Sequence, residues 1–75
     1  MPKMPIISGD KAVSAFSKLG YQVVRQKGSH IRMRHFCDKS KGPITIPRHS
    51  SLGKGLLRSL FRDADITSDE FIKLL

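Results

Sequence analysis

His30 follows a Gly-Ser pair in the stretch RQKGSHIRMRH, which carries four Arg or Lys side chains and two histidines over residues 25–35. A neutral imidazole accepts a proton near pH 7 and the imidazolium returns it, so this residue type suits general acid–base catalysis. The surrounding cations disfavour the charged form, which favours His30 as a base. In a cationic groove, the natural group for such a base is an RNA 2′-hydroxyl, because nearby Arg or Lys side chains stabilise the charge that develops on the phosphate. Judged on spacing alone, an ordinary surface histidine at a strand start is the more frequent explanation.

The other histidines and the cysteine are weaker candidates for chemistry. His49 follows a Pro-Arg pair and could supply a general acid or a phosphate contact, although such a residue more often caps a loop or a helix. His35 falls on the opposite side of its expected strand from His30, so we expect it to be partly buried. Cys37 is expected to pack in the core rather than to act as a nucleophile. A metal site from these four residues is disfavoured because their spacing does not match a zinc motif.

The charge balance favours a polyanionic partner. Fourteen Lys and Arg against six Asp and Glu give a net charge of +8 at pH 7, and nucleic acid is the commonest partner for such a surface. A membrane surface is the rival class, but no apolar run approaches the roughly 20 residues that a spanning helix needs. Residues 1–10 lack the long apolar region of a signal peptide. Cys37 is the single cysteine, so an internal disulfide is excluded and a reducing, cytoplasmic setting is expected.

The length and the apolar pattern predict one small domain over residues 1–75. Ser8 is expected to cap a first helix that Gly20 ends. Thr67 and Glu70 have capping-box spacing at the start of a short terminal helix. The expected elements are a helix between Ser8 and Gly20, strands over 21–27, 30–37 and 43–47, a helix over 55–64 and a short helix over 67–75. This α-β-β-β-α order predicts an α+β fold, a three-stranded antiparallel sheet with two helices on one face.

Alternation along residues 30–37 separates two faces of the central strand. The mostly apolar face is assigned to the core and consists of Ile31, Met33, His35 and Cys37. The open face consists of His30, Arg32, Arg34 and Phe36, joined by Arg25 or Lys27 according to the strand register. On the second long helix, Lys54, Arg58 and Arg62 form a row spaced by four residues. Such a row is usually a solvated face, and here it is also a candidate extension of the expected phosphate-binding surface.

Three segments in order, KGSH, IPRHS and GKGLLRSLFRDADIT, resemble the HicA family of toxins from prokaryotic toxin–antitoxin systems. The resemblance extends over nearly the whole chain, from SGDKAVSAFSKLGY to SDEFIKLL. It implies a fold like the double-stranded-RNA-binding domain and a ribosome-independent ribonuclease that cleaves mRNA. It also implies that the histidine of the GSH motif, His30, is catalytic, and that a HicB antitoxin covers the active site. The general acid stays open between His30 itself, His49, an arginine and water.

We therefore expect RNA cleavage by His30 without a metal or cofactor, with mRNA and a HicB antitoxin as partners and with no membrane or DNA contact by the toxin itself. A non-catalytic RNA-binding module is the first alternative, and it would depend more on the second long helix than on His30. A protein-interaction domain with an acidic partner is the second. The residues expected to contact RNA are Arg25, Lys27, Gly28, Ser29, Arg32, Arg34, His49, Lys54 and Arg58.

Overall fold

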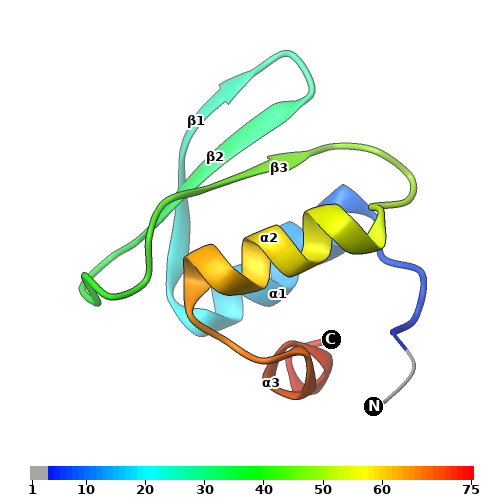
Figure 1. The fold of residues 1–75 in the computed structure, drawn as a ribbon. Helices are drawn as coiled ribbons and strands as arrows, with labels where there is room; N and C mark the ends of the chain where they lie inside the picture. Colours follow the sequence, from blue (N-terminus) through cyan, green and yellow to red (C-terminus); the bar gives the residue numbers. More distant parts are fainter. Residues whose placement is uncertain (1–3) are drawn as a thin grey trace.

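The computed structural model describes residues 4–75, and Figure 1 shows a sheet that helices cover on one side. The strand order is β1-β2-β3, with both neighbouring pairs antiparallel. The elements are α1 (Gly9–Leu19), β1 (Tyr21–Lys27), β2 (His30–His35), β3 (Ile44–Pro47), α2 (Lys54–Ala64) and α3 (Ser68–Lys73). The predicted α-β-β-β-α order with a short terminal helix is therefore confirmed.

The ends of α1 and α3 follow from their capping residues. The Ser8 hydroxyl accepts a hydrogen bond from the Lys11 amide at 3.1 Å and satisfies one of the free donors at the start of α1. Gly20 ends the helix in a left-handed conformation, with φ of 111°, which other residues adopt only at a cost. Thr67 and Glu70 form the predicted capping box at the start of α3. All three predicted helix signals are confirmed.

The core lies between the sheet and the helices. Ile31 and Met33 of β2 are buried, as their alternation predicts, and Ile44 and Ile46 of β3 are buried beside them. Burial of the apolar side chains on this one face of the sheet is the main term that holds the layers together. Because the helices occupy this face, the opposite face of the sheet is left open to solvent (Figure 1).

A β-bulge in β1 decides which of its side chains reach the open face. Val23 pairs with Met33, but the next pair is Arg25 with Arg32, so Val24 is an extra residue without a partner on β2. Paired residues in an antiparallel sheet point to the same side. Arg25 therefore shares the open face with Arg32, and Lys27 shares it with His30. The sequence left the choice between Arg25 and Lys27 open, and both lie on this face.

The prediction that Cys37 packs in the core is wrong, because Cys37 is exposed. β2 ends at His35, two residues earlier than expected, and the chain bends at Phe36. The His35 Nδ1 atom accepts the backbone amides of Cys37 and Asp38, at 3.3 and 2.9 Å. These bonds turn the backbone away from the strand direction, so the alternation stops before Cys37. His35 itself is half-buried, as predicted.

Candidate nucleic-acid interface

The open side of the sheet carries a row of exposed basic side chains. This surface, the basic face, consists of Arg25, Lys27, His30, Arg32 and Arg34. Within residues 4–75, the ion pairs join Arg48 to Asp10 and Arg62 to Asp63. Neither pair includes a residue of the basic face, so in the described part of the chain its positive charge is not neutralised.

Two arginines lie directly opposite one another across β1 and β2, because Arg25 is paired with Arg32. A like-charged cross-strand pair destabilises a sheet, typically by a few tenths of a kcal/mol up to about 1 kcal/mol. A bound polyanion would reverse the sign of this term, because a phosphate there would lie near two cations. Lys27 is paired with His30, so a second cation lies directly beside the imidazole. The arrangement is therefore suited to phosphate binding rather than to stability.

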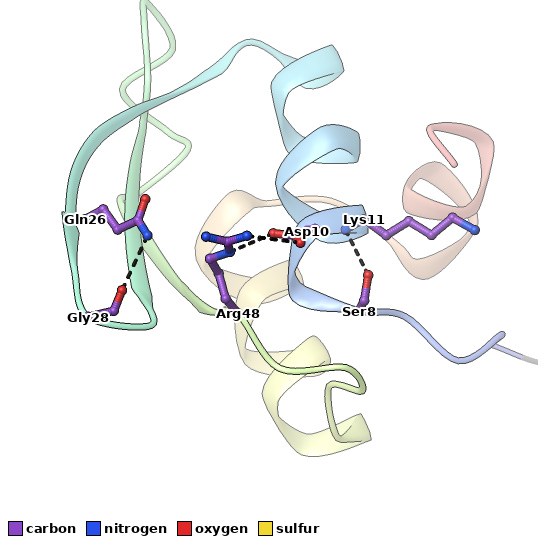
Figure 2. Close-up of polar contacts among 6 residues, drawn as sticks. All are labelled: Ser8, Asp10, Lys11, Gln26, Gly28 and Arg48. Carbon is purple, nitrogen blue, oxygen red and sulfur yellow. Dashed lines mark hydrogen bonds and ion pairs between the residues drawn. The ribbon is translucent and has the colours of Figure 1, made fainter.

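His30 stands at the first position of β2, beside the tight turn of Gly28 and Ser29. Gly28 has a φ of +58°, which favours glycine, and a side chain there would meet open space. The Gln26 side chain donates a hydrogen bond of 3.4 Å to the Gly28 carbonyl oxygen (Figure 2). The imidazole of His30 is exposed, and none of residues 4–75 forms a hydrogen bond to it. It is therefore accessible to a ligand on the basic face.

The end of β3 and the start of α1 hold this turn from the other side. The Arg48 amide donates to the Ser29 carbonyl at 2.7 Å, and the Gly9 amide donates to the His49 carbonyl at 2.8 Å. The Arg48 side chain reaches Asp10, with Nε 3.0 Å from Oδ1 (Figure 2). Gly9 is required at this contact, because a Cβ there would collide with the carbonyl oxygen of Pro47. Two segments distant in sequence, the end of β3 and the start of α1, thus position the Gly28–His30 turn.

The sequence reasoning missed Arg48 and Asp10 as positioning residues. Asp10 lies in the first turn of α1, where a carboxylate interacts favourably with the helix dipole, and it also binds an arginine 38 positions later. The IPRHS segment, which contains Arg48, was the available signal, since it was one of the segments that carried the family resemblance. His49 is exposed, and its backbone rather than its side chain makes the contact to α1.

Two of the expected RNA contacts lie away from the basic face. Lys54 and Arg58 are exposed on α2, and the apolar stripe of this helix, which includes Leu57 and Leu60, is buried in the core. α2 belongs to the helical layer on the covered side of the sheet (Figure 1). The structure therefore brings together Arg25, Lys27, Gly28, Ser29, His30, Arg32 and Arg34, and places Lys54 and Arg58 on a separate basic surface.

Tyr21 and His35 are polar groups with structural roles. The Tyr21 hydroxyl donates to the Gly42 carbonyl oxygen at 2.7 Å. Burial, with smaller effects from Asp63 and Asp38, raises the pKa of Tyr21 to about 12, so the phenol stays protonated. The His35 Nδ1 atom accepts two amides, which leaves the proton on Nε2, 2.9 Å from the Leu19 carbonyl oxygen. Both nitrogens are engaged, so His35 is not placed for acid–base chemistry.

The fold and this surface define a small α+β domain with an exposed histidine on a cationic sheet face. A family model described as the HicA toxin of bacterial toxin–antitoxin systems matches residues 9–66 of the 75-residue chain. The chain therefore belongs to the HicA toxin family, and the match includes α1, α2 and the whole sheet. Comparisons with curated proteins and with solved structures gave no significant match. No helix within residues 4–75 has the length and apolar character to cross a membrane.

Proposed function

We propose that this toxin is a metal-independent endoribonuclease that cleaves mRNA, with His30 as the catalytic residue. The observation that carries the proposal is an exposed imidazole among unneutralised cations at the edge of a tight turn. Membership of a toxin family supports it, because cleavage of mRNA would arrest growth.

In the proposed reaction, neutral His30 accepts the proton of an RNA 2′-hydroxyl. The 2′-oxygen then attacks the adjacent phosphorus, the bond to the 5′-oxygen breaks, and the products carry a 2′,3′-cyclic phosphate and a 5′-hydroxyl. Lys27, directly across from His30, and Arg32, two residues along the same face, stabilise the charge on the phosphate. Arg32 donates a hydrogen bond of 3.0 Å to the Thr45 hydroxyl, which holds its guanidinium over the sheet.

The departing 5′-oxygen takes a proton from the imidazolium of His30 or from a second donor. His30 is paired with Pro47, and His49 follows two residues later in the chain. His49 is therefore the first side chain to test as a general acid. If it has this role, His49→Ala will remove one limb of a bell-shaped pH–rate profile, whereas loss of a phosphate contact will raise KM without a change of shape.

A HicB-type antitoxin would neutralise the toxin by covering His30 and the basic face. Its complementary surface would be acidic, because charge complementarity steers association and sets the register of the two proteins. Such a complex should form more slowly as the salt concentration rises.

The second candidate function is a non-catalytic module for double-stranded RNA. The exposed Lys54 and Arg58 on α2 favour it, because a helix can contact the phosphates of a duplex that is recognised by its shape. Under this function, a duplex should compete with single-stranded RNA for the protein, and neither strand should be cut.

The test is cleavage of an end-labelled single-stranded RNA by purified protein, with a chelator present, beside His30→Ala. The expected result is cleavage by the wild type alone, with equal melting temperatures and with RNA affinity changed less than about threefold. Equal cleavage by both proteins would refute the role of His30. Binding without cleavage by the wild type would favour the double-stranded-RNA module.

A further inference from the structure

A hollow of about 370 Å³ lies beyond the end of β2, away from His30. Its volume is at the lower end of the range for sites that hold small organic groups. The residues that line it come from β2 and the loop that follows, and they are Arg34, His35, Phe36, Cys37, Asp38, Lys39, Lys41, Gly42 and Pro43. Arg34 belongs to the basic face, so the hollow continues that surface.

Phe36 presents an unusually exposed aromatic ring at this hollow. It is 67% exposed, and its ring stacks on His35 with centroids 5.3 Å apart and an interplanar angle of 21°. His35 is held by its hydrogen bonds to Leu19 and Asp38. The phenylalanine therefore rests on a fixed imidazole, while most of its own surface stays open to a flat ligand.

The charges around Phe36 are arranged for an anionic group. Among residues 4–75, neither Arg34 nor Lys39 forms an ion pair or a side-chain hydrogen bond, and both are exposed. Lys41, in contrast, already donates to the carbonyl oxygen of Ala64 at 3.1 Å. The Asp38 carboxylate accepts the Ser40 hydroxyl and amide, at 2.6 and 2.9 Å. Two free cations thus flank the exposed ring.

We infer that this hollow holds one unpaired nucleotide of the RNA strand, with its base stacked on Phe36 and its phosphate bound by Arg34 or Lys39. The inference rests on the proposed function, because it takes the RNA to run along β2 from His30. Arg34 is four residues beyond His30, about 13 Å along the strand at 3.3 Å per residue, so the base lies a few nucleotides from the cut. Aromatic stacking of splayed bases is the usual way in which single-stranded RNA is held.

This subsite would select single strands over duplexes. A base in a duplex is stacked between its neighbours and paired, so it cannot lie on Phe36 unless it leaves the helix. The basic face alone binds phosphate and does not distinguish the two forms by base contacts. Phe36 would therefore provide a preference for single-stranded RNA, which the cations beside His30 cannot provide.

The chain contains no tryptophan, so Phe36→Trp creates a single fluorescent reporter in the hollow. In a His30→Ala background that leaves RNA uncut, single-stranded RNA should quench this tryptophan by stacking. A set of oligonucleotides with an abasic site at successive positions should lose the quenching at one position only. Ile6→Trp is the matched control, since Ile6 is 82% exposed and lies outside the hollow, and its fluorescence should not depend on the abasic position.

The affinity of Phe36→Ala supplies the second measurement. This variant should bind single-stranded RNA about 5- to 150-fold more weakly than its parent, and the critical abasic site should then add no further loss. Unchanged affinity together with unquenched tryptophan would overturn the subsite and leave His30 catalysis standing. Failure of the wild type to bind any RNA would overturn the proposed function and the subsite together. Loss of antitoxin binding with RNA affinity intact would make the hollow a protein site and would also overturn the inference.

Discussion

The salt dependence of RNA binding tests whether the basic face is the phosphate site. Four permanent cations lie on it, Arg25, Lys27, Arg32 and Arg34. For a single strand, the slope of log K against log salt concentration is about −0.7 per phosphate contact, so four contacts give about −2.8. Affinity should then fall about 50-fold between 50 and 200 mM salt. Fluorescence anisotropy of a labelled oligonucleotide, measured with His30→Ala to prevent cleavage, gives this slope directly.

Single charge removals identify the contacts that produce the slope. Arg32→Gln and Arg34→Gln should each reduce its magnitude by about 0.7, and the two changes together by about 1.4. Arg62→Gln is the matched control, because Arg62 is an exposed arginine of α2 outside the basic face. Loss of slope with Lys54→Gln, but not with Arg32→Gln, would refute the assignment and move the phosphates to α2.

Three further predictions concern the scaffold. His35→Ala should destabilise the fold by about 1–3 kcal/mol in urea unfolding, since the Cys37 and Asp38 amides lose their acceptor, whereas exposed His49→Ala should change it by less than about 0.5 kcal/mol. Gly9→Ala should lower the free energy of unfolding by more than about 2 kcal/mol, because its Cβ meets the backbone of Pro47. Gly55→Ala, with open space around it, should stabilise α2 by up to about 1 kcal/mol. Equal effects of the two substitutions would contradict the packing at Gly9. The single tyrosine should titrate near pH 12, and because its folded-state pKa is raised from 10, its stabilising contribution should be complete below pH 10 and disappear as the pH rises towards 12. An absorbance midpoint near pH 10 in the folded protein would show that Tyr21 is not buried as described.

Local signals in the sequence predicted most of the fold. Ser8, Gly20 and the Thr67–Glu70 pair act within one helical turn of their own position, so their roles do not depend on the rest of the chain. The apolar face of β2 could be predicted for the same reason, because alternation is a local property.

Features that depend on a partner segment could not be predicted. The bulge at Val24 appears only when β1 is paired with β2, and no glycine or proline marks it. The exposure of Cys37 depends on where the His35 imidazole is held, which Leu19 of α1 decides. The ion pair of Arg48 with Asp10 joins residues 38 positions apart. The members of the candidate site could thus be predicted, but only the fold showed that Lys54 and Arg58 of α2 lie on a different surface from the basic face.

The like-charged pair of the basic face links the proposed activity to its control. Repulsion between Arg25 and Arg32, which lie opposite one another, weakens the free toxin. Any ligand that brings negative charge to this face relieves that repulsion, and at a given concentration a ligand that binds more tightly stabilises the fold more. RNA and an acidic antitoxin would both bind the cations of this face. The binding of one would therefore exclude the other even where their other contacts differ. An antitoxin that binds this face does not need to touch the His30 imidazole to inhibit cleavage, because occupying the cations around it already removes the phosphate site.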